Sequence, residues 1–220
     1  ADRAQRHTLA LRDVAYVIEY GADSAQQSSL NLLYLLGFSA AKGPLTLFGE
    51  SDERFHVIGG NDQVAERLAD ALDDQLTTGA ELVRIKRLSS GAFELTFRCG
   101  SSTRRVTADH VVLALPFSIL RSSVDYSAAG FDAVKRTAIQ ELGMGTNSKV
   151  HVQFRSRFWE PQGSNGATYS DSVSQSTWDV TRGQSGRSGI LVEYTGGAVG
   201  LTIGNGSTDA QARRFLDALE

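Results

Sequence analysis

The feature that most constrains this chain is an uninterrupted apolar run, VVLAL, at residues 111–115. Strands that are covered on both faces are apolar at every position, whereas half-exposed strands alternate between apolar and polar residues. Pro116 ends the run, and the FSIL residues that follow it fit a short helix. We therefore predict a strand that is covered on both sides in a central sheet, and with it a mixed α/β (α+β) fold.

Patterns elsewhere in the chain predict both helices and strands. Apolar residues at helical spacing indicate helices over residues 9–20, 30–37, 61–72 and 131–142. The expected cap of the second helix is Asp23 or Ser24. Strands are expected over FHVI at 55–58, over ELVRIKRL and AFELTFRC joined as a hairpin by Ser89-Ser90-Gly91, and over residues 148–154.

The last third of the chain changes in composition. From Pro161 to Gly189 it is rich in Gly, Ser, Gln and Thr, which predicts a loop or an irregular strand. GILVEY and VGLTI predict a strand pair around Gly196-Gly197. Thr208 and Gln211 form a capping box for a final helix that is expected to run to Glu220, which is typical of a piece of a longer protein.

Composition and charge exclude several classes of function. The 220 residues are 41% hydrophobic, which is enough for one large domain or two small ones. The 22 Lys and Arg against 25 Asp and Glu give a net charge of -3, so no basic field favours nucleic acid. The single Cys99 and four scattered histidines predict neither a disulfide nor a metal site. Without an apolar stretch that could span a membrane, or a signal-peptide pattern, we expect a soluble, cytoplasmic protein.

Lys149 is the most informative single residue. From Lys149 to Phe154 polar and apolar residues alternate, which places Lys149, His151 and Gln153 on one face of a strand. A lysine at a strand start can hold a water or polarise a cofactor atom when its face lines a pocket. The pattern alone leaves a solvated strand face as the alternative. The chain contains no GxSxG, GxxxxGK[ST], HExxH or GxGxxG motif, so no complete catalytic signature is present.

Three further features have both a structural and a functional interpretation. Gly59-Gly60 before a helix could approach an anionic group through backbone N–H groups, or form only a tight turn. Trp159 and Trp178 could contact substrate, or pack in the core or at its rim. Tyr194, which precedes a double glycine, could enter a cleft or be a packed tyrosine.

Several segments, taken in order, resemble the middle part of flavin-dependent amine oxidases of the monoamine oxidase and L-amino-acid oxidase family. These segments are QSSLNLLYLLGF, HVIGGNDQVAERLADAL, ELVRI, ADHVVLALPFSIL, GTNSKVHVQFRSRFW, QSTWDV and GILVEYTGG. They cover nearly the whole chain. None is diagnostic alone, and the order and spacing together carry the resemblance.

The resemblance implies roles for particular residues. Gly59, Gly60 and Leu82 match positions of the FAD-binding domain, with the Leu82 main chain at the place where the family holds adenine. Ala114 and Pro116 belong to a run that passes close to the cofactor in the family. Lys149 matches the lysine that holds a water against the flavin, which favours the functional interpretation of its face. Tyr194 matches the tyrosine that contacts the substrate carboxylate in L-amino-acid oxidases, and Trp178 is expected beside the substrate.

The resemblance also implies a domain division and its gaps. Residues 1–52 would be a helical part of the substrate-binding region, 53–142 a segment of the FAD-binding domain, and 143–220 the sheet and helix of the substrate domain. The family's N-terminal glycine fingerprint, its C-terminal flavin segment and its carboxylate-binding arginine have no match here. We therefore expect this chain alone to be inactive and to lack bound FAD.

The function that the resemblance implies is oxidation of the C–N bond of an amine or an L-amino acid to an imine. FAD would accept the hydride, O2 would be reduced to H2O2, and the partners would be these small molecules, with a homodimer left open. A flavoprotein desaturase or porphyrinogen-type oxidase is the alternative within the fold. A non-catalytic module that binds a partner through the surface of residues 161–189 is the alternative from another class.

Overall fold

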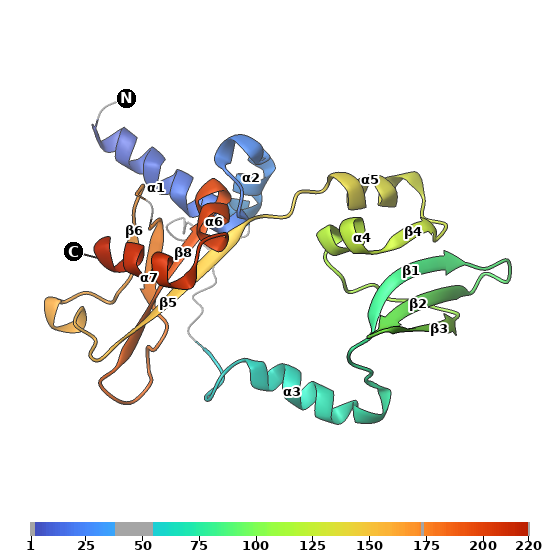
Figure 1. The fold of residues 1–220 in the computed structure, drawn as a ribbon. Coiled ribbons are helices and arrows are strands. Elements are labelled where there is room, and N and C mark those ends of the chain that lie inside the picture. The colour runs from blue at the N-terminus through green and yellow to red at the C-terminus, as the bar shows by residue number, and fades with distance from the viewer. Residues whose placement is uncertain (1–2, 38–54, 173, 220) are drawn as a thin grey trace. The chain divides into compact units, whose positions relative to one another are not determined.

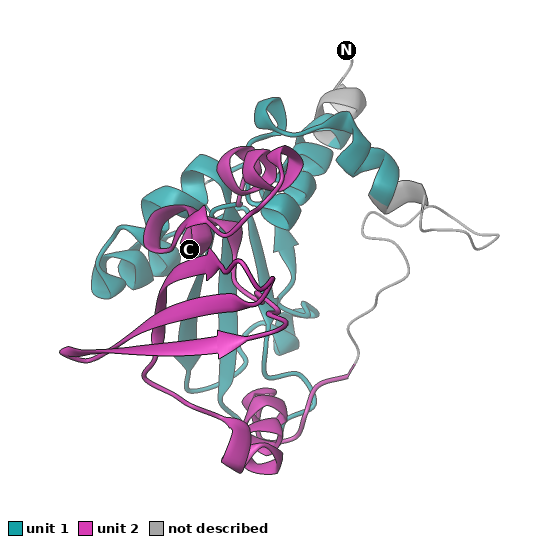
Figure 2. Cartoon of the chain, turned by 90° about the vertical axis from the view of Figure 1, so that its right-hand side faces the viewer, with its two compact units in different colours: residues 1–52, 145–220 teal, residues 53–144 magenta. Residues whose placement is uncertain are grey.

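The computed structural model describes residues 3–37, 55–172 and 174–219, and it divides the chain into two compact units (Figure 2). Unit 1 combines residues 1–52 with residues 145–220, and unit 2 is formed by residues 53–144. Each unit has its own four-stranded sheet (Figure 1). The fold is therefore mixed α/β, as predicted. The expected assignment of the middle segment to an FAD-binding domain stays a proposal.

Unit 1 is built on a sheet with the strand order β5-β8-β7-β6, in which all neighbours are antiparallel. Its elements are α1 (Arg3–Tyr20), the 3-10 helix η1 (Ser24–Gln26), α2 (Ser29–Gly37), β5 (Asn147–Phe154), η3 (Glu160–Gln162), β6 (Thr168–Tyr169), β7 (Ser176–Asp179), β8 (Gly189–Gly196), α6 (Gly197–Gly204) and α7 (Thr208–Asp217). The core under α7 contains Trp159, Leu191 and Phe215, with Val150, Val152 and Phe154 of β5 packed against them.

Unit 2 is built on a sheet with the order β3-β2-β1-β4, in which only the β1–β4 pair is parallel. Its elements are α3 (Asp62–Ala71), η2 (Asp73–Gln75), β1 (Glu81–Arg87), β2 (Phe93–Cys99), β3 (Ser102–Ala108), α4 (Phe117–Ser123), β4 (Asp125–Ala128) and α5 (Ala133–Glu141). The predicted hairpin is confirmed as β1 and β2, and Gly91 in its turn has the expected positive φ of 93°. A core of Ile85, Leu95, Leu120 and Ile139 lies between the sheet and α4 and α5.

Two predicted strands of unit 2 do not form. Residues 111–115 are irregular: Val111 and Leu113 pack on the core, whereas Val112 is 92% exposed, so the run is not covered on both sides. Residues 55–58 are also irregular, with Ile58 93% exposed. A strand needs the backbone of a neighbour, and no described residue supplies one to either segment. Apolar composition alone was therefore misleading here.

The predicted strand pair around Gly196-Gly197 is wrong in its second half, because VGLTI belongs to helix α6. β8 already has β5 on one side and β7 on the other, so no free edge remains for a further strand. At Gly197, φ is 62°, which turns the chain out of the sheet. A Cβ at Gly200 would lie 2.6 Å from the carbonyl oxygen of Thr146, so the glycine allows α6 to pack closely on the sheet.

Strands β3 and β4 were not predicted, and several helix ends also differ from the expected ones. The last helix starts one residue earlier than predicted, because Ser207 is its N-cap and accepts a bond from the amide of Ala210. Thr208 and Gln211 therefore do not form a capping box, and the helix ends at Asp217 rather than running to Glu220. The second helix begins at Ser29, so neither Asp23 nor Ser24 caps it. Asp23 instead accepts a hydrogen bond from the amide of Ala198.

Candidate functional site

Strand β5, at the edge of the unit 1 sheet, presents Lys149 on the face opposite α7. Along β5 exposed and half-buried residues alternate strictly, because the even positions pack on the core under α7. The odd positions Lys149, His151 and Gln153 are exposed on the opposite face. This is the face that the sequence pattern predicted for the lysine.

Two aromatic residues from neighbouring strands lie beside Lys149. Lys149 pairs with Tyr194 across the β5–β8 ladder, and β7 pairs with β8 on the other side, which brings Trp178 next to Tyr194. The Lys149 Nζ atom lies 5.0 Å from the ring centroid of Tyr194 and 5.5 Å from that of Trp178. The two rings meet edge to face, with centroids 5.5 Å apart and an interplanar angle of 83°. We call Lys149, Trp178 and Tyr194 the lysine–aromatic cluster.

The energetics of the lysine–aromatic cluster favour a defined geometry. Each cation–π contact at an exposed site contributes about 0.5–1 kcal/mol, and an edge-to-face aromatic pair contributes about 0.5–1.5 kcal/mol. The sequence analysis singled out all three residues separately, and the structure brings them together. Lys149 is exposed and both rings are half-buried, so the ammonium group is accessible to a small molecule on this face.

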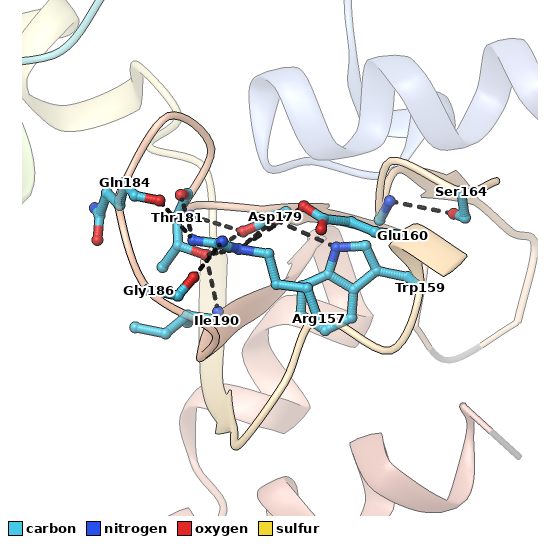
Figure 3. A network of polar contacts seen from close by, with 10 residues as sticks. Arg157, Trp159, Glu160, Ser164, Asp179, Thr181, Gln184, Gly186 and Ile190 are labelled. Carbon is cyan, nitrogen blue, oxygen red and sulfur yellow. Dashed lines mark hydrogen bonds and ion pairs between the residues drawn. The ribbon is translucent and has the colours of Figure 1, made fainter. Parts of the chain in front are cut away.

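A buried polar network fixes the strand ends next to the cluster (Figure 3). Asp179, which follows Trp178 on β7, is 4% exposed and accepts hydrogen bonds from the indole of Trp159 at 3.3 Å and from the amide of Thr181 at 2.7 Å. The Arg157 guanidinium lies 3.6 Å from the Asp179 carboxylate and donates to the carbonyl of Thr181 at 3.0 Å. Trp159 is therefore a core residue, as its structural alternative predicted.

The face of the same sheet that packs on α7 carries a buried ion pair. Glu193 of β8 is fully buried and pairs with Arg214 of α7. Its Oε1 atom has no hydrogen-bond partner in the described structure. Glu193 precedes Tyr194 in the chain, so it anchors the strand from the side opposite the lysine–aromatic cluster.

Gly59 and Gly60 form a tight turn in unit 2, with φ angles of 92° and 121°. The amide of Gly60 donates to the carbonyl of Val57 at 3.0 Å. A Cβ at Gly60 would lie 2.3 Å from a carboxylate oxygen of Asp62, the first residue of α3. An acidic group at this helix start disfavours phosphate, so a cofactor contact here would be a close approach of the backbone.

Leu82 lies near the start of β1, where a register irregularity separates it from Arg84. Its side chain packs against the unit 2 core. The β1–β4 ladder begins only at Arg84, so within the described residues Leu82 has a ladder partner, Phe97, on the β2 side alone. An inward side chain and an unpaired main-chain edge suit a residue that binds a ligand through its backbone.

Ala114 and Pro116 lie in the irregular segment before α4, and both are exposed. Pro116 is the N-cap residue of α4. All five predicted cofactor-binding residues are thus in unit 2, whereas the three residues of the lysine–aromatic cluster are in unit 1. An open depression of about 490 Å³ beside β1, lined by Gly79, Glu81 and Arg98 among others, contains none of the predicted residues.

Neither a metal site nor a membrane-spanning helix is found among the described residues. No group of three or more His, Cys, Asp or Glu side chains in this part of the chain is arranged to hold a metal ion. None of the helices described is both long enough and apolar enough to cross a membrane. Gln175, the first residue of the QSTWDV segment, immediately precedes β7; the sequence indicates no role for it, and its bridge to Tyr194 is seen only in the structure.

The fold matches that of solved oxidase structures. A putrescine oxidase double mutant superimposes on 99% of this chain with a TM-score of 0.75 and 24% sequence identity. This match covers 46% of the putrescine oxidase chain. At this identity the similarity shows the fold alone.

Sequence comparison makes the assignment to a family. The family model for flavin containing amine oxidoreductases matches residues 11–220, so the chain belongs to this family. It is 29% identical over 158 residues to YobN of Bacillus subtilis, covering 68% of this chain and 32% of YobN. It is 28% identical over 161 residues to the flavin-dependent L-tryptophan oxidase RebO of Lentzea aerocolonigenes, covering 72% of this chain and 33% of RebO. The chain thus spans about a third of the length of these relatives.

Proposed function

We propose that the protein oxidises the C–N bond of a small amine or amino acid at the lysine–aromatic cluster, with FAD as the electron acceptor. The observation that carries this proposal is the contact of the exposed Lys149 ammonium group with both the Trp178 and the Tyr194 ring, which meet edge to face. Membership of the flavin containing amine oxidoreductases supports the reaction class.

The proposed reaction consumes the amine, water and O2, and its atoms and electrons balance. The neutral amine loses a hydride from its α-carbon and a proton from its nitrogen, which forms a C=N double bond. Water hydrolyses the resulting imine to a carbonyl compound and an amine or ammonia. O2 finally takes up the two electrons and two protons, giving H2O2. The flavin, when bound, supplies the two-electron acceptor that no amino-acid side chain provides.

The three cluster residues have separate roles in this proposal. Lys149 would hold a water molecule by donating a hydrogen bond, and its charge would stabilise negative charge that develops nearby. The rings of Trp178 and Tyr194 would form a wall that orients the substrate and excludes bulk water. The phenol of Tyr194 would donate a hydrogen bond to a polar group of the substrate.

The charge of the cluster favours one class of substrate. A positive charge repels a protonated amine and attracts a carboxylate. We therefore propose that a carboxylate-bearing amine is preferred over a simple amine. The relative RebO, which acts on L-tryptophan according to its name, is consistent with this preference.

Unit 2 would hold part of the cofactor. The main chain of Leu82 has the open edge that adenine recognition through backbone groups requires, and the Gly59-Gly60 turn has no side chain to obstruct an approaching ligand. Ala114 and Pro116 are exposed and available for contact with the same ligand. These residues would form part of an FAD site. The expectation that this chain alone binds no FAD stays a prediction.

The test is spectroscopic and uses the full-length protein. Oxidised flavin gives an absorption band near about 450 nm, which should bleach when the substrate is added without oxygen. L-amino acids should bleach it faster than amines that lack the carboxylate, and readmitted oxygen should yield one H2O2 for each amine consumed. A flavin that only C–C donors reduce would favour a desaturase. A colourless protein that does not take up FAD would favour a non-catalytic binding module.

A further inference from the structure

Gln175 has an unusual backbone conformation next to the lysine–aromatic cluster. Its φ angle is 25°, and it is the only residue other than glycine with a positive φ in the part of the chain that the structure describes. It is 8% exposed, so this conformation is enclosed by protein. Residues with side chains adopt such angles at an energetic cost and keep them only where surrounding contacts enforce them.

The side chain of Gln175 makes one such contact. Its Oε1 atom accepts a hydrogen bond from the amide of Gly196 at 2.8 Å. Gly196 is the last residue of β8, and a Cβ there would lie 2.3 Å from the carbonyl oxygen of Val17 in α1. The end of β8 is therefore fixed between α1 and the Gln175 amide group.

The backbone of Gln175 lies at the start of the strand that carries Trp178. Gln175 forms a parallel bridge with Tyr194, and Ser176 pairs with the same tyrosine as the first residue of β7. Trp178 follows two residues later on the same face as Ser176. One residue thus connects the strand of Trp178 to the strand of Tyr194 at the place where the two rings meet.

We propose that Gln175 is a positioning residue that sets the spacing of the Trp178 and Tyr194 rings around the Lys149 ammonium group. It acts through the hydrogen bond to Gly196 and touches neither the substrate nor the reacting atoms. The consequence for catalysis rests on the proposed function, whereas the consequence for the geometry of the cluster does not.

The geometry is tested by NMR on the full-length protein with its lysines reductively methylated with 13C, which preserves their charge. The Lys149 methyl resonance is assigned by its loss in Lys149→Arg. Ring currents of Trp178 and Tyr194 should move its chemical shift away from that of exposed lysines. Gln175→Ala should move it towards that value. Gln175→Glu, which retains an acceptor oxygen, should return it. The matched control is Gln184→Ala, at an exposed glutamine in the β7–β8 connection.

The second measurement is the rate of flavin reduction by the preferred amine, expressed per bound flavin, together with KM. Gln175→Ala should lower the rate about tenfold, because small displacements of orienting groups slow a reaction strongly. Gln175→Glu should recover most of the loss. A purely structural role would lower flavin content and the unfolding temperature but leave the rate per flavin unchanged.

Two results would overturn the inference. One is a Gln175→Ala variant whose Lys149 resonance and rate per flavin match those of Gln184→Ala. The other is a Gln175→Gly variant that behaves like the unmodified protein, since glycine accepts the backbone angle but cannot bind Gly196. If no amine reduces the flavin of the unmodified protein, the proposed function fails, and the Lys149 resonance still decides whether Gln175 sets the geometry.

Discussion

The two sheets differ in how they present the residues that the sequence singled out. In unit 1, Lys149, Trp178 and Tyr194 come from three neighbouring strands and form one cluster. In unit 2, the five predicted residues lie on separate segments, and only Leu82 is part of a strand. Strand pairing brings the three residues of the first arrangement together. In unit 2, the contacts of the described residues do not join the predicted residues into one cluster.

The units also differ in what they bury beside their apolar cores. The unit 1 sheet buries hydrogen-bonded polar side chains such as Asp179 and Thr181, whereas no polar side chain among the described residues of unit 2 is buried. Both units leave large apolar side chains more than half exposed, such as Leu30 and Leu33 in unit 1 and Ile58 and Val112 in unit 2. A close-packed core can therefore be argued for each sheet, but only unit 1 carries a candidate site that its own contacts support.

The strongest expected effect is in the polar network of unit 1. Asp179→Ala would leave the Arg157 guanidinium and the Trp159 indole without their buried acceptor, and removing one partner of such a pair typically costs about 3–5 kcal/mol. The free energy of unfolding, measured with urea, should fall by this amount. Asp171→Ala, at an exposed aspartate in the same unit, is the control and should change it by less than about 0.5 kcal/mol. Equal losses in the two variants would show that the buried Asp179 network stabilises unit 1 no more than an exposed aspartate does.

In unit 2, substitutions in the core should lower the free energy of unfolding, whereas substitutions of exposed apolar residues should not. Ile85 is 1% exposed, so Ile85→Ala should lower the free energy of unfolding by about 2–4 kcal/mol. Leu68 is 59% exposed on α3, where no residue is buried, so Leu68→Ala should cost no more than about 0.5 kcal/mol in the 220-residue chain. Denaturant unfolding of both variants checks this. A large loss in Leu68→Ala would show that α3 is packed after all.

The smallest effect concerns helix α1 of unit 1. Tyr16 is 6% exposed and its hydroxyl has no hydrogen-bond partner in the described structure, so Tyr16→Phe should stabilise the protein by about 1 kcal/mol. Burial is also the main reason why the pKa of Tyr16 is raised above its usual value; Glu19 raises it further and Arg12 opposes this.

The raised pKa of Tyr16 gives this prediction a pH dependence. A phenol that stays neutral in the folded state contributes stability that is complete below the unfolded pKa of about 10 and is lost as the pH rises through the higher folded pKa. The unmodified protein should therefore lose stability faster than Tyr16→Phe as the pH rises from about 10 to the higher folded pKa, as measured by thermal unfolding at several alkaline pH values. Parallel curves for the two proteins would contradict a buried, neutral Tyr16.

The sequence predicted those parts of the fold that depend on local pattern. The alternation along β5 located the face of Lys149, and the Ser89-Ser90-Gly91 turn located the first hairpin. It failed for residues 111–115 and 55–58, where apolar composition suggested strands but no described strand pairs with them. Whether a segment becomes a strand depends on its neighbours in space, and composition does not contain that information.

The candidate site was predictable residue by residue but not as an arrangement. Lys149, Trp178 and Tyr194 were singled out separately, and their contact follows only from the β5-β8-β7 order and register. Gln175 lies in the quoted QSTWDV segment, but the sequence indicates no role for it, because that role depends on a backbone angle and on one hydrogen bond to a residue 21 positions away. Such features arise from tertiary structure and leave no motif.

The most direct test of the central claim, that the lysine–aromatic cluster is the oxidation site, is the reaction of the reduced flavin with O2 in full-length Lys149→Met. Because the substitution removes the hydrogen-bond donor and the charge, stopped-flow kinetics should show reoxidation slowed by about a hundredfold. Gln153→Met, on the same exposed face of β5 but further along the strand, should leave the rate unchanged. Oxygen kinetics in Lys149→Met equal to those of the unmodified protein would contradict the account.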